Sequence, residues 1–408
     1  MLTNAEQELV AVCRARQDWA AARLVTWCAR NSFTYNLAGL ATLGQEVLAD
    51  FGPLATTTRW EPAPPVAGWD ERGRAITHAL APTLVAQRPA AAGSPRRRVL
   101  LAIHLDTVYP PEHHAAPQWQ ADGRRLCAPG AVDAKGGVMV MLLALQALAA
   151  TGAAPGLAWT VVLNSDEEIG GPGSAPLFRA LAAGHDLALL FEPCWPDGML
   201  VGARKGSGRF HLIVRGRAAH AGRQFAAGRN AVAALAEALV TLHELNGTAP
   251  GLIVNVAQVA GGGPLNVVPA LACGAGNIRV DTAADWAVCE RRLDDLVAGI
   301  NQREGFQAEW HGGLLNPPRP LSAACQRLYD ECAACGRELG LTLRWRPSGG
   351  ACDGNKLAAA GLPVLDSLGA QGGRLHEPEE YCEIASLTER AALTAVLLAR
   401  LADGTDHP

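Results

Sequence analysis

The sequence is poor in charge and in aromatic side chains, and it carries no block of charges of one sign. Only 18% of its 408 residues are charged, 5% are aromatic, and the net charge is −4 at pH 7. A protein that binds nucleic acid or an anionic membrane needs a concentrated basic surface. We therefore expect neither of these partners, and we expect a small molecule instead.

Long hydrophobic segments are also missing. The first ten residues are polar and acidic, without the apolar core of a signal peptide. The longest apolar run, residues 138–145, is far shorter than the roughly 20 residues that span a bilayer. We expect a soluble cytoplasmic protein.

The cysteines form no disulfide framework. They number eleven, which is odd, and their spacing is irregular, so reduced and mostly buried thiols are the better interpretation. One CxxC pair, Cys332 and Cys335, lies in a helical pattern without a second pair, which argues against a metal or redox role.

The length of the chain favours two domains over one core. Apolar recurrence at helical spacing predicts helices, short apolar runs predict buried strands, and two Pro-rich tracts predict loops. The helices are 4–30, 38–50 and 138–150, the strands are 98–105, 159–163 and 187–191, and the loops are 61–65 and 89–95. The helix at 138–150 is apolar nearly all round, so we expect it beneath a sheet.

A different pattern occupies residues 207–316. In order, it reads as a strand at 210–215, a helix at 230–245, strands at 252–259 and 271–280, a helix at 283–300 and a strand at 307–312. This βαββαβ order is the ferredoxin-like arrangement. Helical and strand patterns resume after it, so the predicted fold is an α/β catalytic domain, residues 1–206 and 317–408, with an inserted ferredoxin-like domain.

Two adjacent acids, Glu167 and Glu168, follow the predicted strand 159–163 where the chain enters a Gly-rich loop. Successive side chains of an extended segment point to opposite sides, so one acid can hold a metal ion while the other transfers a proton. Taken alone, the pair could equally be part of a solvated loop.

The candidate ligands come from loops at the ends of predicted strands, except His376, which comes from a Gly-rich loop near the C-terminus. The set is His104, Asp106, Asp133, Glu167, Glu168, Glu192 and His376. Two imidazoles with several carboxylates favour zinc or a similar divalent ion, and a shared carboxylate would hold two ions about 3.5 to 4 Å apart. Singly, each residue has an ordinary explanation, such as a turn pair between Asp133 and Lys135.

Five motifs occur in an order that resembles a known family. They are HLDTV at 104–108, GAVDAKGG at 130–137, DEEIG at 166–170, FEP at 191–193 and GRAAHAG at 216–222, with further similarity at 204–208, 261–269 and 348–380. The family is the di-zinc amidohydrolases and peptidases, which include glutamate carboxypeptidase, aminoacylase, acetylornithine deacetylase and succinyl-diaminopimelate desuccinylase. The chain looks most like the glutamate carboxypeptidase branch, and the family's catalytic domain with a dimerisation lid agrees with the predicted element order.

The resemblance implies a site with two divalent metal ions, most commonly Zn²⁺, with Co²⁺ or Mn²⁺ as alternatives. Asp133 resembles the carboxylate that bridges the ions. His104 and Glu192 would complete one metal site, and Glu168 and His376 the other. Glu167 resembles the general base that takes a proton from water.

Asp106 is expected to orient His104. It lies two residues further along the predicted strand, on the same side, so its carboxylate could accept the second imidazole N–H and fix the tautomer.

The resemblance also implies roles for lid residues and for the C-terminal substrate loop. His220 would donate a hydrogen bond to the developing oxyanion. Asn266 and Arg279 would hold the substrate, and the planar guanidinium of Arg279 would bind the substrate carboxylate through two hydrogen bonds. Gly350 is predicted to contact the substrate too. A homodimer through the lid is expected, in which His220 enters the neighbouring active site.

Some positions depart from the family pattern. Ala351 and Cys352 stand before Asp353 where the family often has Ser or Thr, and two histidines at 113 and 114 are expected near the mouth of the site. Arg374, two residues before His376, is a hypothesis for substrate specificity, and an exposed loop arginine is the alternative.

We expect hydrolysis of the amide bond in an N-acyl or peptidyl amino acid with a free carboxylate. Carboxypeptidase and aminoacylase activity cannot be separated from the sequence. Other C–N hydrolysis at the same site, of a carbamoyl amino acid or by an aminohydrolase, is one alternative, and a metal-free binding protein is another.

Overall fold

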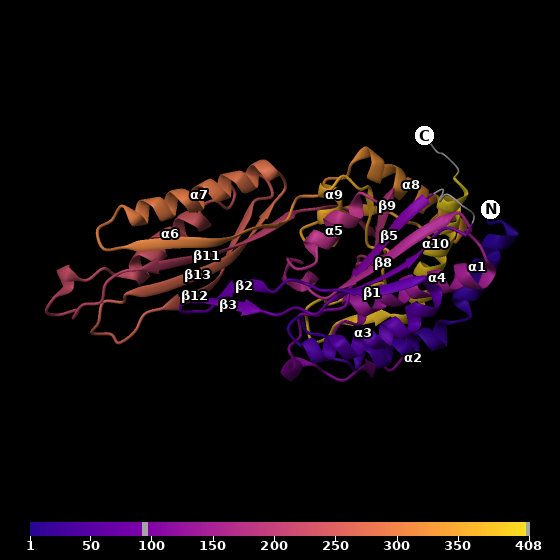
Figure 1. The fold of residues 1–408 in the computed structure, drawn as a ribbon, viewed down its shortest axis with the longest axis horizontal. Helices are drawn as coiled ribbons and strands as arrows, with labels where there is room; N and C mark the ends of the chain where they lie inside the picture. Colours follow the sequence, from indigo (N-terminus) through magenta and orange to yellow (C-terminus); the bar gives the residue numbers. More distant parts are fainter. Residues whose placement is uncertain (92–96, 405–408) are drawn as a thin grey trace.

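The computed structural model describes residues 1–91 and 97–404, so most of the predicted loop 89–95 lies outside the described residues. Figure 1 shows an α/β domain that holds both ends of the chain and an elongated second domain, the lid, beside it. The predicted fold class, a catalytic α/β domain with a ferredoxin-like insertion, is confirmed.

The catalytic domain is built on a six-stranded sheet in the order β1-β4-β8-β5-β9-β16. Its strands are β1 (Thr57–Glu61), β4 (Thr83–Arg88), β5 (Arg97–His104), β8 (Leu157–Asn164), β9 (Leu187–Leu190) and β16 (Val364–Leu365). The last four strands in this order run parallel, and β1 and β4 are antiparallel additions at one edge. The carboxyl ends of the parallel strands therefore meet at one edge, where open α/β sheets place ligands.

Helices cover both faces of this sheet. Along β5, Leu101 and Ile103 face the larger core, whereas Leu100 and Ala102 face the smaller one, as the alternation of a strand requires. The larger core lies under α1 (Asn4–Arg14), α2 (Gln17–Cys28), α3 (Leu37–Phe51), α4 (Gly137–Thr151), α8 (Ala323–Glu338) and α10 (Ile384–Asp403), and the smaller under α5 (Ala175–Ala182) and α9 (Asp353–Ala359).

The predicted helical segment 4–30 is two helices, with a break at Ala15 and Arg16. The buried positions Leu9, Cys13, Leu24 and Trp27 keep helical spacing across the break, so the apolar pattern carries no signal of it.

Helix α4 is buried, as its all-round apolar sequence predicts. Among the described residues, the stretch Ala131–Thr151 is long and apolar enough to span a membrane, but 78% of its apolar window is inside the protein, which is the position of a core helix. Gly137 allows this close packing, because a Cβ there would lie 2.0 Å from the carbonyl oxygen of Phe191.

The lid has the predicted βαββαβ order. It consists of β11 (Gly206–Arg215), α6 (Ala231–His243), β12 (Ile253–Gly261), β13 (Leu271–Val280), α7 (Ala283–Asn301) and β14 (Gln307–Asn316), and the antiparallel sheet order is β12-β13-β11-β14. Both helices lie on one face of this sheet (Figure 1), where Phe210, Leu212 and Val214 form the lid core with them.

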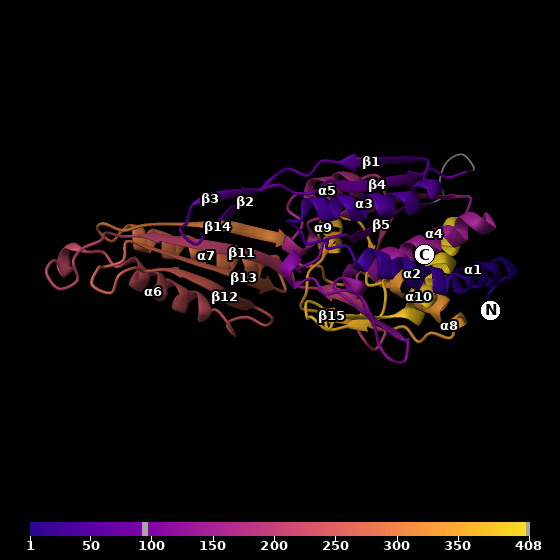
Figure 2. The same cartoon turned by 90° about the horizontal axis from the view of Figure 1, so that it is seen from below.

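A hairpin from the catalytic domain packs on the other face of the lid sheet. It is formed by β2 (Val66–Trp69) and β3 (Ala75–His78), and Figure 2 shows it beside β14. Trp69 stacks on His311 with ring centroids 4.1 Å apart, and Arg215 donates to the carbonyl of Gly73 over 3.4 Å. The hairpin therefore joins the two domains in addition to the two chain crossings, and the sequence analysis did not predict it.

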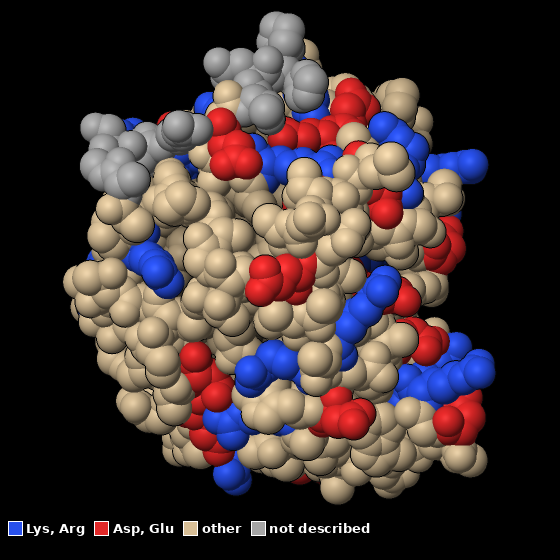
Figure 3. All heavy atoms as spheres, turned by 90° about the vertical axis from the view of Figure 1, so that its right-hand side faces the viewer, with Lys and Arg blue, Asp and Glu red and all other residues tan. Residues whose placement is uncertain are grey.

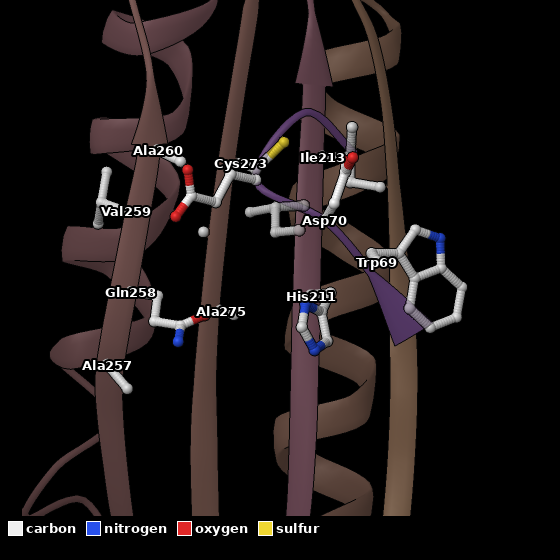
Figure 4. A pocket seen from close by; sticks show the side chains of 13 residues that line it. Trp69, Asp70, His211, Ile213, Ala257, Gln258, Val259, Ala260, Cys273 and Ala275 are labelled. Atoms are coloured by element: carbon white, nitrogen blue, oxygen red, sulfur yellow. The ribbon is translucent and has the colours of Figure 1, made fainter. Parts of the chain in front are cut away.

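A groove of ≈ 510 Å³ lies beside the tip of this hairpin, with Trp69, His211 and Cys273 among its lining residues (Figure 4). It occupies the face of the lid sheet that carries no helix. It contains none of the predicted metal ligands.

Two smaller sheets complete the catalytic domain. Strands β10 (Leu200–Arg204) and β15 (Trp345–Ser348) pair in parallel, and the other sheet contains β6 (Gln118–Trp119), β7 (Arg125–Cys127), β17 (Gly372–Gly373) and β18 (Tyr381–Glu383). The eleven cysteines all lie within the described residues and are free thiols. On the face in Figure 3, acidic and basic side chains are interspersed.

Candidate metal centre

The candidate ligands converge at the carboxyl edge of the parallel strands. His104 is the last residue of β5, Glu167 and Glu168 open a short turn after β8, and Glu192 follows β9. These three strands are neighbours in the order β8-β5-β9, so their ends lie side by side. Asp133 enters from the irregular turn Ala131–Gly136 before α4, and His376 from the loop after β17.

Asp133 lies between the two imidazoles. Its Oδ1 is 3.1 Å from Nε2 of His104, and its Oδ2 is 3.4 Å from Nε2 of His376. The same His376 nitrogen is 3.3 Å from Glu168 Oε2, and the His104 nitrogen is 4.0 Å from Glu192 Oε2. Each oxygen of Asp133 therefore belongs to a separate group of one imidazole and one carboxylate.

Burial and the repulsion between neighbouring carboxylates shift the pKa values of the acids in this cluster. Burial, with the nearby charge of Asp133, raises the pKa of Glu192 to about 8. Burial and the charge of Glu192 raise the pKa of Glu167 well above its usual range. Burial would also raise the pKa of Asp133, but hydrogen bonds from His104 and His376 outweigh it and lower that pKa.

The donor set fits divalent metal ions. The cluster gathers more carboxylates than imidazoles, namely Asp133, Glu167, Glu168 and Glu192 against His104 and His376. Ligand atoms of His104, Asp133 and Glu168 all lie within 4.8 Å of one another. Buried acids at this density need positive charge nearby, and mixed nitrogen and oxygen ligands suit zinc or a related ion.

The lid residues predicted to contact the substrate lie at opposite ends of the lid. Arg279 is near the hinge, opposite Ser207 in the sheet, and it is half-buried where its charge interacts with Glu167 of the same chain. His220 and Asn266 lie in loops beyond the last sheet pairs Arg215–Leu271 and Gly261–Ala272, at the far end, and both are exposed. A ten-residue strand such as β11 spans roughly 30 Å, so His220 is far from the metal ligands of its own chain.

The family model of peptidase family M20/M25/M40 matches residues 100–400. The chain belongs to this family. It is therefore a hydrolase of the M20 peptidases.

Individual relatives agree with this assignment. Carboxypeptidase G2 of Pseudomonas sp. strain RS-16 is 29% identical, with 76% of this chain and 75% of that protein covered. A succinyl-diaminopimelate desuccinylase of Paracidovorax citrulli is 29% identical, with coverages of 74% and 81%. The crystal structure of YXEP of Bacillus subtilis, described as a dinuclear metal binding peptidase, has a TM-score of 0.63 at 14% identity and covers 96% of this chain and 99% of that one.

In this M20 hydrolase, the Asp106 side chain contacts more than His104. Nδ1 of His104 is 3.4 Å from the carboxylate of Asp106, on the side that the sequence predicts, and 3.0 Å from its backbone carbonyl. The carboxylate also accepts the backbone N–H groups of Glu167 and Glu168, both over 3.2 Å, and the hydroxyl of Thr34 over 2.7 Å. Asp106 therefore holds the acid pair in place as well.

A buried glutamate, Glu380, fixes the Asp133 turn, and the sequence analysis assigned it no role. Its carboxylate accepts backbone N–H groups from Gly130, Val132 and Asp133 over 2.9 to 3.0 Å. Burial and the charge of Asp133 raise its pKa to about 7. An acidic residue four positions after the His376 ligand candidate was the only sequence signal.

The centre opens into a cavity of ≈ 350 Å³ within the catalytic domain. Its lining includes Gly350 and Arg374, as the prediction of substrate contacts requires, together with Trp195, Pro196, Val201 and Leu375. Arg374 is 57% exposed and pairs with Glu379 over 3.5 Å and with Glu377 over 3.9 Å.

The expectation that the histidines at 113 and 114 lie at the mouth of the site is wrong. Neither lines this cavity. His114 is half-buried near the end of α2 and Lys135, where burial lowers its pKa.

Replacing Glu380 with Gln should destabilise the Asp133 turn. The amide NH₂ would face backbone N–H donors, so we expect the free energy of unfolding to fall by about 1–3 kcal/mol and bound metal after dialysis to decrease. Chemical denaturation and metal analysis measure these effects. The exposed Glu389 on α10 provides a matched control, and a Glu380→Gln variant as stable and metal-rich as Glu389→Gln would contradict this role.

Proposed function

We propose that this M20 hydrolase uses two divalent metal ions to cleave the amide bond of an N-acyl or peptidyl amino acid with a free carboxylate. The position of Asp133 carries the proposal, because its two oxygens face two separate pairs of imidazole and carboxylate. Carboxypeptidase and desuccinylase relatives and a dinuclear structural neighbour support it.

The chain's own residues supply the binding and the proton transfer. His104, Asp133 and Glu192 would hold one ion, and Asp133, Glu168 and His376 the other, most favourably Zn²⁺ given the ligand set. When bound, the ions would lower the pKa of water and polarise the scissile carbonyl. Glu167, held by Asp106 through its backbone, would take the proton from water and pass it to the departing amine.

Arg279 is the proposed partner of the substrate carboxylate. Its guanidinium donates through Nε to Asn277 over 2.7 Å, and its terminal N–H groups make no hydrogen bond within residues 1–91 and 97–404. Its charge interacts with Glu167, so a carboxylate bound by Arg279 would hold the adjacent amide bond towards the metal centre.

A panel of N-acyl amino acids and dipeptides, assayed before and after chelation, tests this function. We expect amide hydrolysis that chelation abolishes and that zinc, cobalt or manganese restores. Hydrolysis that survives complete metal removal, or its absence from the whole panel with metal present, would contradict the proposal.

The adjacent acids should give different phenotypes when replaced. Glu167→Ala should abolish turnover while metal content and substrate binding remain, since a general base lowers the barrier rather than the ground state. Glu168→Ala should lower metal content. Metal analysis and inhibitor binding separate the two variants, and reversed phenotypes would show that the two roles are exchanged.

We further propose a homodimer that pairs the edges of two lid sheets. The edge strand β12 exposes Ile253 (46%) and Val259 (65%), and the neighbouring α6 exposes Val240 (58%). An exposed apolar edge strand is a template for pairing. Two β12 strands paired antiparallel about a two-fold axis would place the far end of one lid beside the hinge of the other, so that His220 and Asn266 complete the partner's site.

Complementation between two inactive variants tests this dimer. Glu167→Ala and His220→Ala subunits, unfolded together and allowed to re-pair, should recover roughly a quarter of wild-type activity, because each mixed dimer has one intact site. Each variant refolded alone is the control. No recovery despite demonstrated subunit exchange would show that His220 does not act across the interface.

A further inference from the structure

We infer that Trp195 is a specificity-determining residue whose indole forms an apolar platform for the acyl half of the substrate. The inference rests on the proposed amide hydrolysis and names which chemical group this chain would prefer. It follows from the lining of the cavity, from the way the indole is held, and from the partners of the charged residues around it.

The platform is adjacent to the metal centre on two loops. Trp195 follows Glu192 by three residues, and Leu375 directly precedes His376. Both line the ≈ 350 Å³ cavity, together with Pro196 and Val201. A substrate with its amide bond at the centre would therefore have this apolar wall within reach of one of its two halves.

The indole is fixed before any substrate binds. A tight turn holds the backbone of Trp195. The backbone carbonyl of Trp195 accepts the N–H of Gly198 over 2.7 Å, and the backbone N–H of Trp195 donates to the carbonyl of Met199 over 2.9 Å. The guanidinium of Arg346 lies 4.1 Å from the ring centroid and pairs with Asp197 over 3.5 Å. A rigid aromatic side chain loses little conformational freedom on binding, so its contact area contributes to affinity.

The positive charges of the cavity are already offset by carboxylates of the protein. Arg204 forms a bidentate ion pair with the buried Asp366 over 2.6 and 3.3 Å, and Arg374 pairs with Glu377 and Glu379. An anionic group in this cavity would share these arginines with the carboxylates, which weakens its attraction. An apolar group beside the indole is not subject to this competition, so the wall favours an apolar substituent over an acidic one.

The position of Arg279 decides which half of the substrate reaches this cavity. Arg279 lies on the lid near the hinge, opposite Ser207, where its charge interacts with Glu167, and it is the proposed site of the free carboxylate of the amino acid. With that end held at the lid, the acyl end extends from the metal centre into the catalytic-domain cavity. Its volume is in the range of small-molecule sites and accommodates more than an acetyl group.

Two substrate series test the inference in wild type, Trp195→Ala, Trp195→Phe and Trp119→Ala. One series varies the acyl group from acetyl to hexanoyl and benzoyl on a single amino acid, and the other varies the amino acid under a constant acetyl group. Trp119 is 46% exposed on β6 and does not line the cavity, so it is the matched control.

We expect Trp195→Ala to lower kcat/KM for hexanoyl and benzoyl substrates about ten-fold or more relative to acetyl, as for lost apolar contacts in a pocket. Trp195→Phe should keep the wild-type preference, and the ratios in the amino-acid series should not change in either variant. If the Ala variant does not fold, Trp195→Leu replaces it, with a smaller loss in the same direction.

Equal losses for acetyl and benzoyl substrates, or a change confined to the amino-acid series, would overturn the inference while the proposed function stands. Failure of the wild-type enzyme to hydrolyse any member of either series would overturn the inference, and failure on the dipeptides of the panel as well would refute the proposed function.

Discussion

The arrangement of the centre depends on where Asp133 is held. Its carboxylate must face His104 with one oxygen and His376 with the other, at 3.1 and 3.4 Å. Glu380 fixes the backbone of this turn through three N–H groups, and Gly137 lets the following helix contact the end of β9. The sheet edge, the turn and the C-terminal loop thus position one carboxylate between two imidazoles.

The lid adds a second constraint, because it separates the residues that substrate binding would need. Arg279 is at the hinge near its own Glu167, whereas His220 and Asn266 are at the far end of β11, β12 and β13. The hairpin β2–β3 holds the helix-free face of the lid sheet through Trp69 and Gly73. In the proposed dimer, the lid of the second subunit would supply His220 and Asn266.

The sequence predicted the parts of the fold that have strong local patterns. The buried strands β5, β8 and β9 and the βαββαβ lid follow from apolar runs and element order, and His104, Glu167, Glu168 and Glu192 follow from polar residues at strand ends. Asp133 lies instead in the irregular turn before α4. The hairpin was missed because β2 and β3 are short and half-exposed, and their packing partners are over a hundred residues away. The roles of Asp106 and Glu380 depend on backbone contacts that no side-chain pattern encodes.

The most direct test of this account is anomalous diffraction from crystals of the protein prepared with zinc. The account predicts two ions, with one oxygen of Asp133 bound to each, His104 and Glu192 on the first ion, and Glu168 and His376 on the second. A single ion with the Asp133 carboxylate turned away from it would contradict the account.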